Sequence, residues 1–148
     1  MAFIGRLLYH VKQKDNLRIV PIIVGDTGTG KSTLLNVIKA MFAPDKVANI
    51  LSTHEITFGL ESKYEKDIIL VHEVCESLSK KLGEDVFKQM ACGEDISIPR
   101  KYQSAISIPW RVPIFLCGNE YISYRDIGGS VSRRLAILGL TSMLNRKI

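Results

Sequence analysis

The chain has 148 residues, of which 46% are hydrophobic and 24% charged, and its formal net charge is +5. This length and composition fit one globular domain over residues 1–148, and they exclude a disordered chain. No apolar run approaches the length of a membrane span, and Arg6 interrupts the apolar N-terminal residues that a signal peptide would need, so we expect no membrane partner.

The charge is unevenly distributed along the chain. Residues 1–96 carry 12 basic and 13 acidic residues, a net charge of −1, whereas residues 97–148 carry 8 and 2, a net charge of +6. The basic part suits contact with a polyanion or with a phosphate between subunits, although a solvated basic face would have the same composition. The three cysteines are odd in number and lack metal-ligand spacing, which favours a reducing, intracellular compartment.

Residues 2–14 have the apolar spacing of an amphipathic helix. We expect residues 1–15 to form a helix that packs on the rest of the domain. The residues that would share its apolar face are Phe3, Ile4, Leu7, Leu8 and Val11.

The segment from Gly25 to Ser32 fits G-x-x-x-x-G-K-[ST], the pattern of a phosphate-binding loop (P-loop). An apolar, β-branched segment at 18–24 predicts a strand before it, and residues 32–40 predict a helix after it. Glycines let successive backbone N–H groups point at one centre, and the helix directs its positive end there. The predicted nucleotide-binding residues are Gly25, Asp26, Thr27, Gly28, Thr29, Gly30, Lys31, Ser32 and Thr33.

Within this loop, Lys31 is expected to reach the β- and γ-phosphates, and the Ser32 hydroxyl is expected to bind Mg²⁺. ATP and Mg²⁺ are therefore the predicted cofactors.

Residues 67–73 predict a strand buried on both faces, because they contain four consecutive aliphatic residues. Such strands end at the ligand-binding edge of a parallel sheet. Glu73, at this end, can join Ser32 as a metal ligand or orient and deprotonate the attacking water. His72 can contact nucleotide or a neighbour, but we favour a structural role for it.

The other segments before residue 96 predict structural elements without chemistry of their own. Residues 47–50 suit a short strand, 52–58 a capped helical turn, and 61–66 a charged surface connection. Residues 77–91 predict an amphipathic helix that Gly83 weakens in its middle and that ends at Cys92 and Gly93.

Residues 96–109 alternate apolar and small polar residues around a centre formed by Arg100, Lys101 and Tyr102, which predicts a β-hairpin with these three at its tip. Pro99 implies that one strand is bulged or lies at an edge. Cations can hold phosphates while a tyrosine stacks on a base or sugar, so the tip suits binding of single-stranded nucleic acid. A hairpin with ordinary surface charges would show the same pattern.

Residues 112–119 predict another buried strand, which ends in an amide. Asn119 can hydrogen-bond the attacking water or the γ-phosphate without adding charge beside Glu73. Farther on, Arg133 and Arg134 precede the last predicted strand, at 136–140. The pair suits an arginine finger that completes the site of a neighbouring subunit, or else a surface pair or a contact to an acidic partner.

Taken together, four segments resemble the superfamily 3 helicases of DNA viruses, a branch of the AAA+ ATPases. The chain looks closest to the motor of poxvirus-type primase-helicases and their phage and plasmid relatives, over about residues 20–140. The phosphate-binding loop is shared by many ATPases, whereas the third motif and the spacing from Asn119 to Arg134 point to this family. The four motifs are the loop from Gly25 to Ser32, the strand ending at Glu73, the segment 93–102, and the strand ending at Asn119 with 128–135 after it.

The resemblance implies an α/β fold: a P-loop NTPase with a parallel AAA+-like sheet of strand order 5-1-4-3-2, flanked by helices and carrying a β-hairpin insertion. It implies a hexameric ring of identical subunits with ATP between them. Asn119 would be the sensor, Lys101 would lie near the DNA-gripping tip, and Arg134 or Arg133 would be the finger.

The expected function is therefore an ATP-dependent helicase or translocase of viral or mobile-element DNA replication, acting on single-stranded or fork DNA. Primase or other replication domains are the partners it implies, and a host cytoplasm or a viral replication site is the implied location.

One departure keeps other functions open. The second motif of the family often ends in two acids, whereas here His72 takes the first place and leaves Glu73 alone. Mg²⁺ would then be held mainly through Ser32 and water, or hydrolysis would be slow. A P-loop assembly subunit with weak hydrolysis is one alternative. A small nucleotide kinase is another, although we find no arginine-rich lid segment.

Overall fold

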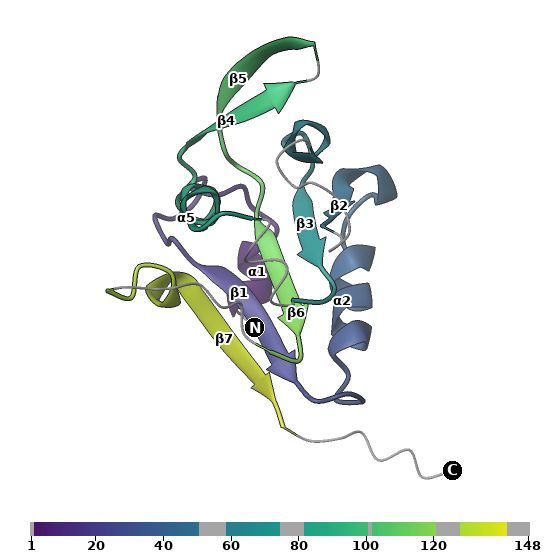
Figure 1. The fold of residues 1–148 in the computed structure, drawn as a ribbon. Helices are drawn as coiled ribbons and strands as arrows, with labels where there is room; N and C mark the ends of the chain where they lie inside the picture. The colour runs from purple at the N-terminus through teal and green to yellow at the C-terminus, as the bar shows by residue number, and fades with distance from the viewer. Residues whose placement is uncertain (1, 51–58, 75–81, 101, 121–127, 142–148) are drawn as a thin grey trace.

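A computed structural model of the chain describes residues 2–50, 59–74, 82–100, 102–120 and 128–141. It shows a central β-sheet with helices on both faces and a two-stranded hairpin that projects from one end (Figure 1). The helical turn expected at 52–58 and Lys101 lie outside the described residues. Among those described, no helix is long and apolar enough to cross a membrane.

The central sheet has five strands, all parallel, in the order β2-β3-β6-β1-β7. If only the strands of this sheet are numbered, in chain order, their order across the sheet starting from β7 is 5-1-4-3-2. The labels run differently because β4 and β5 form a separate sheet. The strands are β1 (Val20–Gly25), β2 (Val47–Asn49), β3 (Ile68–Val71), β6 (Ile114–Gly118) and β7 (Leu135–Leu140).

The inner strands are apolar on both sides because both faces of the sheet are covered. All residues of β3 and β6 are buried. Along β1, Ile22 and Val24 face one hydrophobic cluster, and Ile23 between them faces another. This burial explains why the sequence of these strands reads as continuous aliphatic runs.

Each face of the sheet has its own helices. On one face, α1 (Ala2–Arg6) packs Ile4 against the cluster around Phe115, and Leu7 directly after it is part of that cluster. Helix α2 (Lys31–Ala40) contributes Leu35 and Ile38 to the same cluster. On the other face, α5 (Glu84–Cys92) contributes Phe87 and Met90. Short 3-10 helices complete the fold: η1 (Pro44–Lys46), η2 (Leu60–Ser62) and η3 (Ser132–Arg134).

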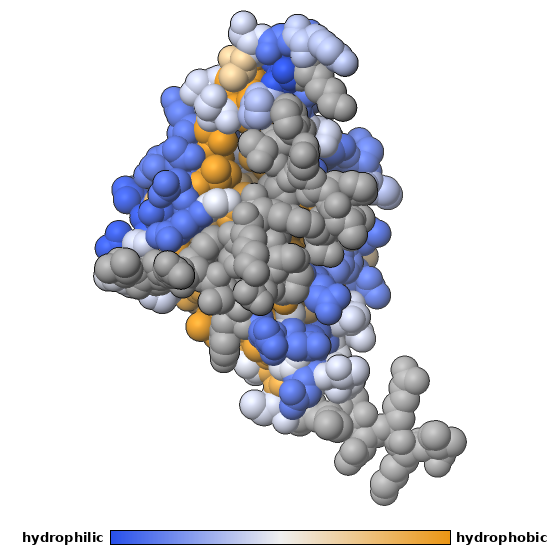
Figure 2. Space-filling model, in the orientation of Figure 1, coloured by the Kyte–Doolittle hydropathy of each residue, from blue (hydrophilic) through white to orange (hydrophobic). Residues whose placement is uncertain are grey.

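The predicted hairpin is confirmed. Strands β4 (Asp95–Arg100) and β5 (Gln103–Pro109) pair antiparallel, with an irregularity between Ile98 and Arg100 at the expected Pro99. Its inner side joins the core through buried Ile96 and Ile98, and Figure 2 shows an apolar strip that descends from the hairpin towards the sheet. The hairpin is therefore a projecting arm with a firmly packed base.

Trp110 fixes that base. Its indole is 1% exposed and donates a hydrogen bond to the Val112 carbonyl at 2.8 Å. Its backbone N–H donates to the carbonyl of Glu94, just before β4, at 3.0 Å. The two strands are thus tied together where they leave the core.

The N-terminal helix is much shorter than predicted. It ends at Arg6, and residues 7–19, which we call the strap, cross the molecule in turns towards β1. The backbone N–H of Val11 donates to the Arg111 carbonyl at 2.8 Å, and Lys12 has a φ of 65°. A residue in the left-handed region cannot continue a right-handed helix, so tertiary contacts replace the helix that the apolar spacing favours.

The helix predicted at 77–91 is not continuous: residues 82 and 83 are not helical, and residues 77–81 lie outside the described residues. Within the described residues, helix α5 begins at Glu84, with Gly83 immediately before it, so Gly83 caps the helix rather than weakening its middle. The predicted end is confirmed: the helix stops at Cys92, and Gly93 has a φ of 62°, a conformation that glycine adopts without strain.

Candidate functional site

Most of the residues predicted for nucleotide chemistry line one cavity of about 530 Å³. It lies at the carboxyl edge of the sheet, beyond the ends of β1, β3 and β6. The cavity brings together Lys31, Glu73 and Asn119. The residues that line it are Thr27, Gly28, Gly30, Lys31, Ser32, Thr33, His72, Glu73, Cys117, Gly118 and Asn119.

Strand register explains why these residues meet. Strand β6 lies between β1 and β3, with Gly118 opposite Val24 on one side and Leu116 opposite Val71 on the other. The Val74 N–H then donates to the Cys117 carbonyl at 2.8 Å, which ties the segment carrying Glu73 to β6. Neighbouring strands lie roughly 4.8 Å apart, so the three strand ends form one compact wall.

The glycine-rich loop takes a conformation that requires its glycines. Gly28 and Gly30 have φ values of 87° and 91°. A side chain at Gly25 would approach the Leu140 carbonyl oxygen to 2.5 Å, so β7 also excludes any larger residue there. The buried Thr29 closes the turn by donating from Oγ1 to the Asp26 carbonyl at 2.8 Å. Gly25, Asp26 and Thr29 therefore frame the loop without lining the cavity.

The Lys31 ammonium is held by the loop itself. Nζ donates to the carbonyls of Gly25 and Asp26, at 2.6 Å each. Helix α2 starts at Lys31, so its first N–H groups face the cavity beside exposed Ser32 and Thr33. Ammonium, hydroxyls and free helical N–H groups together make a site suited to an anion.

Glu73 and Ser32 are the oxygen donors that suit Mg²⁺. Both are exposed and line the same cavity. A carboxylate and a hydroxyl, with water completing the set, fit the preference of Mg²⁺ for oxygen. Across the described part of the chain, no group of three or more His, Cys, Asp or Glu residues could hold a metal ion, so water would have to supply most ligands.

His72 is bound to a residue that the sequence did not single out. Its Nε2 lies 3.1 Å from Oδ1 of Asn49, at the end of the neighbouring strand β2. This contact fits the structural role that we favoured for His72. An amide at the carboxyl end of a predicted parallel strand was the available signal for Asn49.

Cys117 lies in the cavity wall behind these groups. Burial raises the pKa of the Cys117 thiol, and the positive charge of Lys31 opposes that shift. The thiol is a free, buried group, and it stays protonated at neutral pH because its pKa is raised above an already basic value.

Arg133 and Arg134 lie at the opposite edge of the sheet. They belong to η3, just before β7, whose Leu135 pairs with Val20 and whose Leu140 pairs with Gly25 of the loop. Five steps of a strand span roughly 17 Å, so neither arginine reaches the cavity of its own chain. Arg134 donates from Nε to Cys92 Sγ at 3.2 Å and also donates to the Ser130 carbonyl.

The amino edge also holds an arginine that no sequence motif singles out. Arg18 shares a cleft of about 380 Å³ with Arg133 and Arg134, more than 100 positions along the chain. The other residues of this cleft, which we call the arginine cleft, are Asn16, Leu17 and Ile19. A cation directly before the first predicted strand was the signal, but local sequence does not reveal its distant partners.

The hairpin tip lies away from both sites. Tyr102, with a φ of 59°, is fully exposed, and Arg100 Nε donates to the Ser104 carbonyl at 3.3 Å. The hairpin leaves the body just before β6 begins, at the end of the sheet away from the cavity (Figure 1). Tyr102 is thus accessible, and neither Arg100 nor Tyr102 lines the cavity.

A family model, described as a family of unknown function (DUF5906), matches residues 23–134. The chain belongs to the DUF5906 family. The match runs from within the strand before the glycine-rich loop to Arg134, and the matched span includes the predicted residues Glu73 and Asn119. No curated protein matches the chain in sequence.

Solved structures share the fold of this DUF5906 chain. The A form apo structure of the NrS-1 C-terminal region matches with a TM-score of 0.65 and 21% identity, over 90% of this chain and 32% of that one. The X-ray structure of JCV helicase matches with a TM-score of 0.52 and 11% identity, over 84% of this chain and 36% of that one. The chain thus spans about a third of each, and at such identities the likeness concerns the fold alone.

Proposed function

We propose that the chain is an ATP-dependent helicase or translocase motor that works on single-stranded or fork DNA as a ring of identical subunits. The observation that carries the proposal is the shared cavity: Lys31, Glu73 and Asn119, far apart in sequence, line one wall. The fold likeness to a helicase supports the same reading.

In this proposal the loop binds the nucleotide. The N–H groups at the start of α2 and the Lys31 ammonium hold the β- and γ-phosphates, whose oxygens replace the carbonyls of Gly25 and Asp26 as partners of Nζ. Ser32 and Glu73 hold Mg²⁺, which neutralises charge on the phosphates when bound.

Hydrolysis is assigned to the residues opposite the loop. Glu73 orients the attacking water and accepts its proton, and Asn119 donates a hydrogen bond to that water or to the γ-phosphate. The exposure of both side chains beside Lys31 supports these roles, since each needs access to the same small volume.

The arginines are assigned to the site of a neighbouring copy. Arg133 and Arg134 lie at the amino edge, roughly 17 Å from the loop of their own chain. An arginine finger at this distance can act only on a nucleotide that is bound to another copy of the chain. A guanidinium at the γ-phosphate stabilises charge that develops during transfer, and this geometry requires at least a dimer.

The hairpin is assigned to DNA. Exposed Tyr102 offers a ring for stacking, and Arg100 and Lys101 offer charge for the backbone. Helix α5 ends at Cys92, shortly before β4 begins the hairpin. A shift in the arginine cleft can therefore reach the tip through the contact of Arg134 with Cys92.

Steady-state ATP turnover with and without single-stranded DNA tests this function. We expect turnover that DNA stimulates, and Lys31→Ala should abolish it, because a neutral side chain cannot hold the phosphates. Turnover retained by Lys31→Ala would overturn the assignment of the loop. Phosphate transfer to a nucleoside monophosphate would favour a nucleotide kinase instead.

One observation favours a second function, an assembly subunit that binds ATP and hydrolyses it weakly. Among the residues that the structure describes, Glu73 is the one carboxylate that lines the cavity, and the neighbouring His72 is bound to Asn49. Nucleotide-dependent self-association without turnover would favour this alternative over the motor.

A further inference from the structure

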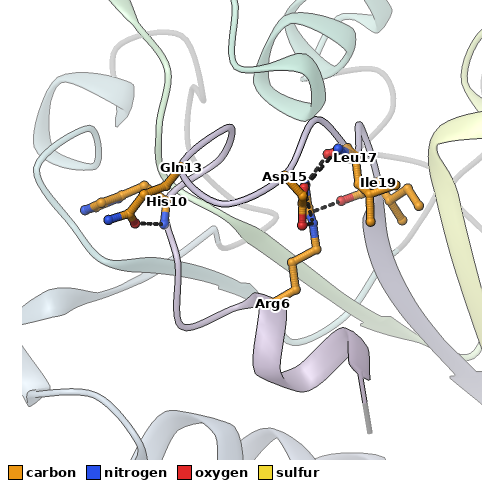
Figure 3. A network of polar contacts seen from close by, with 6 residues as sticks. All are labelled: Arg6, His10, Gln13, Asp15, Leu17 and Ile19. Atoms are coloured by element: carbon orange, nitrogen blue, oxygen red, sulfur yellow. Dashed lines mark hydrogen bonds and ion pairs between the residues drawn. The ribbon is translucent and has the colours of Figure 1, made fainter.

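The N-terminal strap is held by one guanidinium. Arg6, at the end of α1, donates from Nε to both carboxylate oxygens of Asp15 at 3.1 and 3.2 Å, and from Nη2 to Oδ1 at 3.1 Å. The same side chain donates from Nη1 to the Ile19 carbonyl at 3.1 Å and from Nη2 to the Leu17 carbonyl. Figure 3 shows the Arg6 side chain in contact with Asp15, Leu17 and Ile19, all of the strap. We call this group the Arg6 clamp.

The clamp brackets Arg18. Its two carbonyl acceptors belong to the residues directly before and after Arg18, so the backbone is fixed on both sides of this position. Asp15 adds a third restraint, because its Oδ1 accepts the Leu17 N–H at 2.9 Å. The backbone direction at residue 18, and hence the place of the Arg18 side chain in the arginine cleft, follows from Arg6.

The arginine cleft has unused donors. Within the described residues, the side chains of Arg18 and Arg133 take part in no hydrogen bond or ion pair, and Arg134 uses part of its fork on Cys92 and Ser130. Three arginines line this cleft, and guanidinium groups that lie close together repel one another unless an anion lies between them. A phosphate matches the planar fork of arginine, so the cleft is suited to one.

The clamp itself is not suited to bind the anion. The Arg6 side chain is 14% exposed, and its guanidinium N–H groups already donate to Asp15 and to backbone carbonyls. The carboxylate of Asp15 balances its charge. Any contribution from Arg6 must therefore pass through Arg18.

We propose that Arg6 and Asp15 are positioning residues: they hold Arg18 in the arginine cleft, where it joins Arg133 and Arg134 on the terminal phosphates of a nucleotide carried by a neighbouring copy. This proposal rests on the proposed function. It adds the strap, which carries no phosphate-binding motif, to the machinery of the neighbour's site.

The test measures kcat, KM and ATP affinity of the full chain in four variants. Arg18→Gln should lower kcat by about 10- to 100-fold, because one donor to the reacting phosphate is lost. Arg6→Gln should lower kcat by a similar factor while KM stays within about twofold, since the chain's own loop is untouched. Lys14→Gln, on the same strap, is the matched charge control and should stay within about twofold of the parent. Arg6→Lys keeps the charge without the fork and should be intermediate.

A double variant separates positioning from mere stability. If Arg6 acts through Arg18, the Arg6→Gln/Arg18→Gln chain should be no slower than Arg18→Gln alone. Multiplied losses would overturn the proposal. Thermal unfolding is measured for each variant. If Arg6→Gln is unfolded at the assay temperature, Asp15→Asn replaces it in the test. Asp15→Asn keeps an oxygen that can accept the Leu17 N–H.

Mixing two variants tests whether the arginine cleft acts on the nucleotide site of a neighbouring copy. Arg6→Gln subunits retain a complete loop and Glu73, whereas Glu73→Gln subunits retain a complete arginine cleft. A mixture should therefore turn over ATP faster than either variant alone at the same total concentration. Unchanged kcat in Arg6→Gln, with Lys31→Ala inactive, would overturn this inference and leave the motor function standing. Absence of turnover in the parent chain would overturn both.

Discussion

The carboxyl edge of the sheet and its amino edge hold the side chains proposed for function by different means. At the carboxyl edge, Lys31, Glu73 and Asn119 follow directly from strand ends that are neighbours in one sheet. At the amino edge, Arg18, Arg133 and Arg134 come from two segments that are distant in sequence, and side-chain hydrogen bonds hold two of them in place. The first edge is built by strand register, and the second is built by tertiary contacts. The amino edge should therefore be the more easily uncoupled by single substitutions.

Among substitutions that leave the phosphate-binding loop intact, the largest effect is expected at the amino edge. Arg134→Ala should lower turnover by about 10³- to 10⁵-fold, the range for loss of an arginine finger, while ATP still binds to the chain's own loop. Mixing with Glu73→Gln subunits should restore turnover if the finger acts across an interface. No complementation at any ratio would count against that role.

Arg133→Ala is the comparison that decides between the pair. Arg133 is exposed, and its side chain lacks the Cys92 contact of Arg134. A loss confined to Arg134→Ala, at equal thermal stability, would identify Arg134 as the finger, whereas a loss confined to Arg133→Ala would reverse the assignment.

The next largest effect belongs to the carboxyl edge. Glu73→Gln should lower kcat by about 10²- to 10⁴-fold, because the amide cannot accept the proton of the attacking water. ATP affinity should change little by comparison, since Lys31 and the loop remain. Equal losses of affinity and turnover would instead indicate that Glu73 serves mainly to hold the metal.

A smaller effect is expected at the hairpin tip. Tyr102→Ala should weaken single-stranded DNA binding by about 1–3 kcal/mol, the value of one base stacked on an aromatic ring. Tyr102→Phe keeps the ring and should bind as the parent does. Equal weakening in both variants, measured by titration with a labelled oligonucleotide, would exclude stacking.

The smallest effect concerns the Arg6 clamp and pH. The hydrogen bond from Arg6 holds the pKa of Asp15 below its ordinary value of 3.8, with burial opposing the shift. A lowered folded-state pKa stabilises the fold above pH 3.8, and this stabilisation is lost as pH falls through the folded pKa. Asp15→Asn should lower Tm by about 1–3 °C at neutral pH and converge with the parent in acid. A constant difference at all pH values would rule out ionisation of Asp15 as the cause.

The sequence predicted the carboxyl edge better than the amino edge for a physical reason. Motif spacing and buried aliphatic runs are local signals, and parallel strands bring their ends together without further information. The hairpin was predictable on the same grounds, because its alternation and turn are local. The catalytic and binding roles of these residues stay predictions.

What the sequence did not predict depends on contacts between distant segments. The apolar spacing of residues 2–14 favours a helix, but Val11 binds Arg111 and Arg6 binds the residues around Arg18, so the helix ends early. The contact between His72 and Asn49 also joins two strands through their register, 23 positions apart. Helical periodicity depends only on residues that are near in sequence, so it cannot predict contacts between distant segments.

Trp110 has a practical consequence, because it is the only tryptophan of the chain. Its indole is sealed between the hairpin and the body, so its fluorescence should be that of an apolar environment. Any loosening of the arm would admit water and shift this emission to longer wavelength. The molecule thus has an optical reporter at the joint between its two sheets, available in rapid mixing without any label.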